Sequence, residues 1–118
     1  EVDFGTDIVM ESALKRFLAS GKKRLILDLR NNPGGSMAET RNILNFWIES
    51  GNPLFILKYP KLEVTNYALN ASLADWSKNE IVILINGDTA SAAEIIAATL
   101  REYFPTNSVI IGDTSYGK

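Results

Sequence analysis

Ser91 is the residue with the clearest potential for chemistry, because it stands where a buried strand gives way to a predicted helix. The strand is expected over 81–85 and the helix over 90–103. The first turn of a helix has backbone N–H groups without intrahelical partners and carries a positive field, and both stabilise an oxyanion. Ser91 is therefore a candidate nucleophile. The alternative is that Ser91 only begins the helix, as serine often does.

A serine nucleophile needs a base, and the composition restricts which base this chain can supply. The chain contains no histidine and no cysteine, which excludes a Ser–His–Asp triad, a cysteine nucleophile and zinc sites built on these residues. Lysine is the obvious remaining base. Lys118 would need burial to favour its neutral amine, and Ile110, Ile111 and Tyr116 are the expected walls. The alternative is an exposed lysine at a frayed chain end.

Glu94 and a glycine turn are two further features of interest. Glu94 follows Ser91 by three residues, so the two share one face of a helix. Its carboxylate could orient the serine or meet the lysine ammonium, or it could be a capping or solvated group. The Pro33-Gly34-Gly35 turn either serves only a tight turn or lets backbone N–H groups approach a ligand closely.

Alternating helices and strands must position these residues. Buried strands are indicated by short, continuous apolar runs, and helices by apolar residues at helical spacing. Helices are expected over 6–20, 37–50 and 90–103, and strands over 24–29, 54–58, 62–67, 81–85 and 108–111. This order predicts an α/β fold with a mainly parallel sheet. The loops 31–35, 86–89 and 112–118 leave strand ends and should open onto one rim of that sheet.

The bulk composition indicates one ordinary globular domain of 118 residues, 46% hydrophobic and 22% charged. A net charge of −2 gives no basic footprint, so nucleic acid is not expected as a partner. Lys22, Lys23 and Arg24 form a charge run that we interpret as a solvated turn. No signal peptide or membrane span is visible, and both ends of the chain are expected to be cuts in a longer protein.

Three motifs together carry a family resemblance. The stretches LILDLRNNPGG (25–35), NGDTASAAEI (86–95) and GDTSYGK (112–118) resemble the signature, nucleophile and lysine segments of the carboxy-terminal processing peptidases, also called tail-specific proteases. The three occur in order with suitable spacing, and the match covers nearly the whole chain. Residues 1–118 are therefore expected to be the catalytic core of such a peptidase.

The resemblance implies a fold of the ClpP/crotonase type with repeated β-β-α units. It implies a serine endopeptidase that cleaves proteins near the carboxy terminus, with Ser91 as nucleophile and Lys118 as general base. Glu94 matches a supporting acid, and the backbone N–H groups of Gly35 and Ala92 match the oxyanion hole. No cofactor and no metal are implied. The expected partner is a protein or peptide with a free carboxy-terminal tail. The expected location is extracytoplasmic, in a bacterial periplasm or cell envelope, and homo-oligomerisation stays open.

The sequence departs from the family pattern at several points. Nothing in it resembles the PDZ domain that family members commonly carry, and the chain ends before a polar partner that often follows the lysine. Asp88 stands where glycine or another small residue is more usual. Two alternatives stay open. One is a non-catalytic binding module on the same scaffold, as in the interphotoreceptor retinoid-binding proteins. The other is an acyl-CoA enzyme of crotonase type, against which the Ser91 and Lys118 pairing argues.

Overall fold

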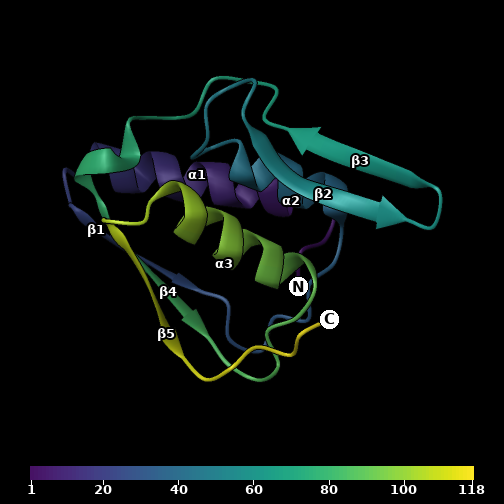
Figure 1. The fold of residues 1–118 in the computed structure, drawn as a ribbon. Helices are drawn as coiled ribbons and strands as arrows, with labels where there is room; N and C mark the ends of the chain where they lie inside the picture. The colour runs from purple at the N-terminus through teal and green to yellow at the C-terminus, as the bar shows by residue number, and fades with distance from the viewer.

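A three-stranded parallel sheet organises the chain in the computed structural model, which describes residues 1–118 (Figure 1). The strand order is β1 (Arg24–Asp28), β4 (Glu80–Ile85), β5 (Ser108–Gly112). Arg24 pairs with Glu80, and Ile81 pairs with Ser108, so all three strands end at the same edge. The predicted α/β class with a mainly parallel sheet is confirmed. The carboxyl ends of these strands are the place where functional groups gather in such folds.

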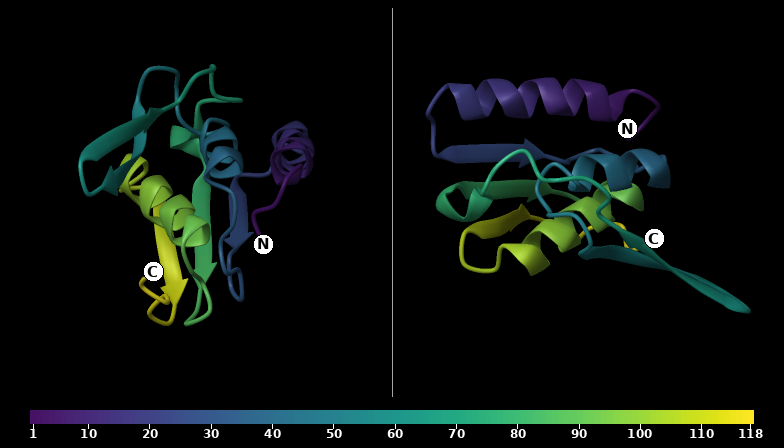
Figure 2. Two further views of the ribbon diagram at one scale, coloured as in Figure 1. Left: turned by 90° about the vertical axis from the view of Figure 1, so that its right-hand side faces the viewer. Right: turned by 90° about the horizontal axis from the view of Figure 1, so that it is seen from above.

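Side chains alternate across this sheet, and only one face is covered. Leu27, Ile81 and Ile83 are buried beneath α2 (Met37–Leu44) and α3 (Ala92–Tyr103). On the opposite face Ile26 and Ile111 are exposed by 65% and 52%. Helix α1 (Thr6–Ala19) runs alongside the β1 edge (Figure 2). It is followed by Gly21 in a left-handed conformation with φ 70°, a common way for a helix to stop.

Helix α2 is shorter than the sequence predicts, since it ends at Leu44 rather than near Ser50. The reason is Asn45, whose side chain binds other parts of the chain. Its amide donates to the Ile48 and Asn70 carbonyls, and its oxygen accepts from the Leu69 and Asn70 N–H groups. These hydrogen bonds compete with helical pairing and redirect the backbone into turns. The expected helix over 37–50 is therefore wrong in its last turn and a half.

A hairpin of β2 (Pro53–Tyr59) and β3 (Leu62–Tyr67) forms a separate antiparallel sheet. It projects from the body of the molecule (Figures 1 and 2). Residues 68–79 are irregular apart from the short 3-10 helix η1 (Trp76–Lys78). Trp76 anchors this segment in the core, where it stacks on Phe17 and contacts Trp47.

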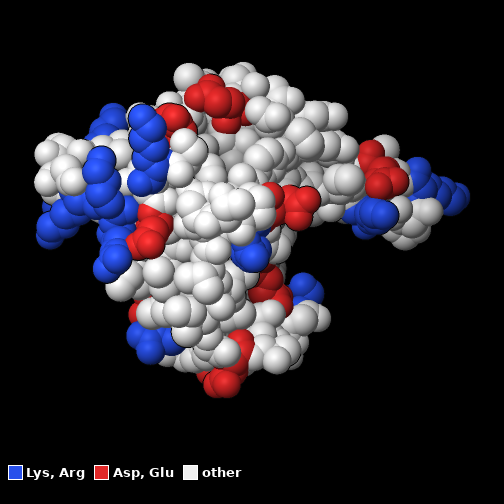
Figure 3. Space-filling view, turned by 60° about the vertical axis from the view of Figure 1, so that its left-hand side comes forward, with Lys and Arg blue, Asp and Glu red and all other residues white.

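Lys and Arg gather over the end of the molecule that carries α1 and the turn into β1 (Figure 3). Lys22, Lys23 and Arg24 are exposed in that turn, as the interpretation of a solvated turn requires. No helix has both the length and the apolar character needed to cross a membrane.

Candidate active site

Three loops meet at the carboxyl ends of the parallel strands, as the sequence predicts. The loop after β1 accepts a hydrogen bond from the loop after β4, through Ala90 N–H and the Asn32 carbonyl at 3.0 Å. The loop after β4 accepts one from the segment after β5, through Tyr116 N–H and the Thr89 carbonyl at 2.9 Å. Residues far apart in sequence therefore share one rim.

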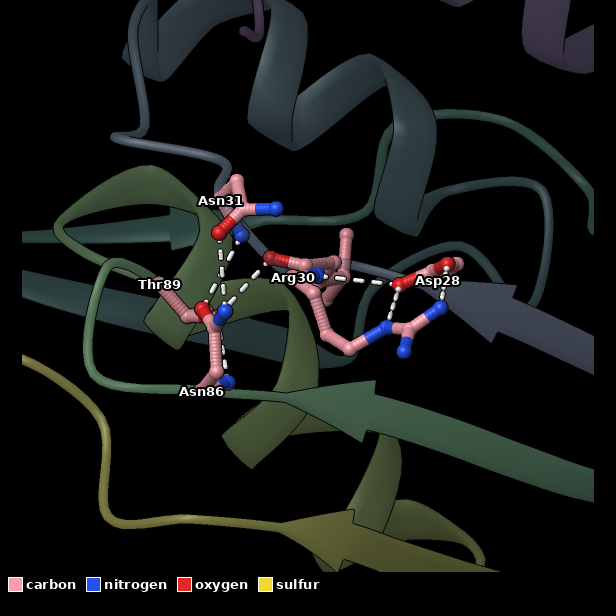
Figure 4. A network of polar contacts seen from close by, with 6 residues as sticks. Asp28, Arg30, Asn31, Asn86 and Thr89 are labelled. Atoms are coloured by element: carbon pink, nitrogen blue, oxygen red, sulfur yellow. Dashed lines mark hydrogen bonds and ion pairs between the residues drawn. The ribbon is translucent and has the colours of Figure 1, made fainter.

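A polar network locks the first two loops together (Figure 4). The side chains of Asn31 and Asn86 pair across the loops: Asn86 Oδ1 accepts from Asn31 N–H at 3.0 Å, and Asn86 Nδ2 donates to Asn31 Oδ1 at 2.8 Å. The buried Thr89 hydroxyl donates to the Leu29 carbonyl at 2.8 Å. Sequence reasoning treated these residues only as loop signals. Their polar side chains directly after two buried strands were the available clue.

Asp28 and Arg30 form an exposed pair at the end of β1 (Figure 4). The Arg30 guanidinium donates to both Asp28 oxygens, at 2.9 and 2.7 Å, and the Arg30 N–H donates to Asp28 Oδ1 at 3.1 Å. These hydrogen bonds lower the pKa of the Asp28 carboxyl to about 2. The pair holds the strand end in the direction that leads into the glycine turn.

Ser91 has an unusual backbone conformation, with φ 53° and ψ −121°. It stands outside the helix, because α3 begins at Ala92, two residues later than the predicted start at Ala90. A positive φ at a residue with a Cβ stores about 1–3 kcal/mol of strain and occurs often at functional sites. Serine nucleophiles on sharp strand-to-helix turns have this kind of geometry.

The glycine turn packs directly against the Ser91 backbone. Gly34 has φ 98°, and a Cβ at that position would lie 2.7 Å from Ser91 Cβ and 2.8 Å from Ala92 N. Only glycine fits such a contact. The turn therefore brings the glycine backbone into close contact with the serine backbone.

Gly35 and Ala92 each have a free backbone donor, since no hydrogen bond in the structure uses the N–H of either residue. Val2 binds the opposite side of the glycine turn: its N–H donates to the Gly34 carbonyl and its carbonyl accepts from Ser36 N–H, both at 2.7 Å. In a parallel bridge of this kind the N–H of the middle residue, Gly35, faces away from Val2. Sequence reasoning missed this supporting role of the N-terminal segment.

Glu94 joins the serine and lysine segments. One carboxylate oxygen, Oε2, accepts from Ser91 N–H at 2.7 Å and Lys118 N–H at 3.1 Å. The other, Oε1, accepts from the Ser115 hydroxyl and Gly117 N–H, both at 2.6 Å. Burial raises the pKa of the Glu94 carboxyl, but these four hydrogen bonds outweigh it and hold that pKa below its ordinary value. Glu94 thus caps α3 through the Ser91 N–H, as the capping alternative requires, and it also holds backbone of the lysine segment rather than meeting the lysine ammonium.

The Lys118 backbone lies near the Ser91 backbone, because the N–H groups of both residues donate to Glu94 Oε2. The Lys118 side chain is exposed and forms no ion pair. No hydrogen bond links the Ser91 hydroxyl to the Lys118 amine. The expected apolar burial of Lys118 is not formed, since Ile111 and Tyr116 are exposed by 52% and 68%. Ile111 lies on the uncovered face of the sheet, whereas Tyr116 does lie beside Lys118 but leaves it open to solvent.

An open pocket of about 480 Å³ borders this side of the site. It is lined by Asn31, Pro33, Asp88, Ala90, Tyr116 and Lys118. Asp88, the residue that departs from the family pattern, is exposed, and its N–H donates to Asn86 Oδ1 at 3.2 Å. The carboxylate is therefore accommodated without disturbing the loop that leads to Ser91.

A mixed α/β fold with a strained serine at a strand-to-helix turn is an architecture that hydrolytic enzymes use. The sequence profile of peptidase family S41 matches residues 3–118, and the chain belongs to that family. The resemblance that the three motifs carry is thereby confirmed.

Individual relatives agree with this assignment. The chain is 35% identical over 109 residues to the carboxy-terminal processing protease CtpA of Bacillus subtilis, and 31% identical to a probable CtpA-like serine protease of Staphylococcus aureus. Each alignment covers 92% of this chain and 22% of the relative, so the chain spans about a fifth of their length. Among solved structures, a photosystem II D1 C-terminal processing protease superposes with a TM-score of 0.83 and 27% identity, over 98% of this chain and 29% of that chain.

Proposed function

We propose that residues 1–118 form the catalytic core of a serine endopeptidase that cleaves protein substrates near their carboxy terminus. The observation that carries this proposal is the bridge through Glu94, which places the Ser91 and Lys118 backbones on one carboxylate oxygen beside the glycine turn. Membership in peptidase family S41 supports the reaction class. The names of the Bacillus subtilis relative and of the superposed protease support the position of cleavage.

The mechanism assigns one role to each group. Neutral Lys118 takes the proton of the Ser91 hydroxyl as its oxygen attacks the scissile carbonyl carbon. The N–H groups of Gly35 and Ala92, which have no partner in the structure, donate to the developing oxyanion. Lys118 then returns the proton to the leaving amine, and water releases the acyl group from Ser91. No metal and no cofactor enter these steps.

Lys118 must lose water contact for this role, because it is exposed in the structure. The pocket that Lys118 shares with Tyr116 and Asp88 is open, so a bound polypeptide would cover it. Removal of water disfavours an ammonium relative to a neutral amine. Substrate binding would therefore both fill the pocket and prepare the base.

The exposure of Lys118 also favours a second candidate, a non-catalytic module that binds peptides on the same scaffold. In that role Ser91 and Lys118 contact a bound chain without acylation. Cleavage assays separate the two candidates, since a binding module retains affinity without turnover.

Two variants of the full chain test the proposal. Ser91→Ala and Lys118→Ala should each lower kcat/KM for an unstructured peptide with a free carboxy terminus by about a thousandfold or more, as loss of a nucleophile or base does. Ser12→Ala and Lys22→Ala make the same changes at exposed positions and should retain full activity. Equal turnover by wild type and Ser91→Ala would remove Ser91 as nucleophile. An amidated version of the peptide tests whether the tail itself is recognised.

The expected location belongs to the same proposal. We place the protein outside the cytoplasm, in a bacterial periplasm or cell envelope, as the resemblance to the carboxy-terminal processing peptidases implies. A solved lipoprotein from Streptococcus agalactiae, with a TM-score of 0.58 and 26% identity, has a related fold. Fractionation of cells that express the protein at its natural level tests this location.

A further inference from the structure

The segment after β5 has few contacts of its own, although it carries Lys118. It forms no helix or strand beyond Gly112. Of the four hydrogen bonds that residues 113–118 donate, one goes to the Thr89 carbonyl and three go to Glu94. The position of the lysine segment therefore depends chiefly on one side chain of another element.

The side chain that accepts these hydrogen bonds has to be a carboxylate. All four groups that face Glu94 are donors: three backbone N–H groups and the Ser115 hydroxyl. A carboxylate only accepts, and its two oxygens provide about four lone-pair sites, so its capacity is filled. A glutamine amide of the same shape would turn an NH₂ group towards two donors. Glu94 also lies in the first turn of α3, where the helix favours negative charge.

The same carboxylate acts on the nucleophile. Ser91 has a strained conformation with φ 53°, and its N–H donates to Glu94 Oε2 at 2.7 Å. A hydrogen bond to a charged acceptor is strong enough to offset strain of this size. One side chain thus fixes both the strained serine and the lysine segment.

We propose that Glu94 is the positioning residue of this site, an anionic clamp that, together with the Ser115 hydroxyl, holds the Lys118 segment against the strained Ser91 turn. The catalytic consequence rests on the proposed function, whereas the clamp itself is a property of the fold. Glu94 touches no reacting atom. It acts by limiting the motion of the lysine backbone relative to the serine.

Amide hydrogen exchange, measured residue by residue by NMR in the full chain at neutral pH, tests the clamp without any assay of activity. Glu94→Gln should raise the exchange rates of the Ser91, Gly117 and Lys118 amides by about tenfold or more, as loss of a hydrogen bond to a charged group does. Ile83 in β4 should exchange as in wild type. Glu102→Gln makes the same change at an exposed position of α3 and should leave all of these rates unaltered.

Substitutions at Ser115 supply a milder test and a rescue. Ser115→Ala should raise the exchange rate of the Gly117 amide, and Ser115→Thr, which keeps the hydroxyl, should restore it. If Glu94→Gln also raises the exchange rate of the Ile83 amide, the variant has loosened the whole fold and Ser115→Ala becomes the deciding test. In Ser115→Ala, a raised exchange rate at Gly117 with an unchanged rate at Ile83 supports the clamp. Unchanged rates at Ser91, Gly117 and Lys118 in both variants overturn it.

Kinetics then connect the clamp to catalysis. Glu94→Gln should lower kcat by about tenfold or more with little change in KM, because the side chain positions the reacting groups and does not bind substrate. A higher KM with normal kcat would overturn the positioning role. Should wild type show no peptidase activity, the proposed function fails, and the exchange rates still decide whether the clamp exists.

Discussion

Ser91, the proposed nucleophile, has a strained backbone conformation. Its φ of 53° leaves the α-helical region, and the helix begins only at the next residue. The neighbouring Gly34 and the Glu94 carboxylate hold it there from two sides. Strain of this kind persists only where the surrounding structure determines it.

Ser91→Gly should therefore be more stable than Ser91→Ala, although both remove the hydroxyl. Glycine adopts a positive φ without strain, which recovers about 1–3 kcal/mol, and it loses about 0.5–1 kcal/mol through the greater freedom of the unfolded chain. We expect a net difference of about 1 kcal/mol in the free energy of unfolding. Urea denaturation of the two variants measures it. Equal stabilities would show that the Ser91 backbone is unstrained.

The sequence identifies the candidate residues of the site more readily than it predicts what surrounds them. Ser91, Glu94 and Lys118 are identifiable because each stands in a motif with fixed spacing. The partners of Glu94 are backbone N–H groups from residues 117 and 118, which no side-chain pattern marks. The exposure of Lys118 was one of the two alternatives that the sequence left open, and the structure has the exposed one.

At the scale of elements, the loop after β1 is held in one position by contacts on several sides. Val2 binds one side of the glycine turn, and the Ser91 backbone lies against the other. The Asn31 and Asn86 side chains tie the same loop to the end of β4. Three elements thus determine where the free Gly35 N–H lies.

Gly34→Ala should be far more damaging than a glycine substitution elsewhere. The added Cβ would overlap Ser91 Cβ and Ala92 N, and alanine would also have to adopt a φ of 98°. We therefore expect the free energy of unfolding to fall by about 2–5 kcal/mol. Gly21→Ala is the matched control, because Gly21 also has a positive φ of 70° but no atom within 4 Å of the new Cβ. It should cost about 1 kcal/mol. Thermal unfolding of both variants measures the difference, and similar losses would contradict the close contact.

Element types were predictable from sequence, and their ends were less so. The runs in β1 and β4 are apolar and short, and the hairpin alternates around a turn, so both patterns indicate strands. Helix α2 continues its apolar spacing past Leu44, yet Asn45 ends it by binding residues 69 and 70. A contact between segments this far apart overrides local propensity, and a single sequence does not reveal it.

The whole molecule depends on an aromatic cluster at the end remote from the site loops. Trp76 is 1% exposed, stacks on Phe17 with ring centroids 6.1 Å apart, and lies 5.8 Å from Trp47. Its Nε1 donates to the Phe46 carbonyl at 2.9 Å. The cluster fastens the irregular segment 68–79 to α1 and to the turns after α2.

Trp76→Ala should lower the free energy of unfolding by about 3–5 kcal/mol, the usual cost of removing a large buried aromatic side chain. The free energy of unfolding of a domain of this size is about 5–15 kcal/mol in total, so the variant would lose a large share of its stability. Trp76→Phe keeps the stacking and should lose less. Phe4→Ala removes a ring that is 97% exposed and should change stability little. Guanidinium denaturation followed by the fluorescence of Trp47 measures these differences.

The parallel sheet also implies an order of events during folding. β4 pairs with β5 across the shorter stretch of chain, Ile81 with Ser108, whereas β1 must reach β4 over the longer one, Arg24 with Glu80. Closing a longer loop costs more entropy and slows the step that requires it. Ser91, Glu94 and Lys118 all belong to the unit that closes first, and Gly35 arrives with β1. On the proposed function, a nascent chain would therefore hold Ser91 and Lys118 together before Gly35 arrives, and catalysis would wait until β1 has docked.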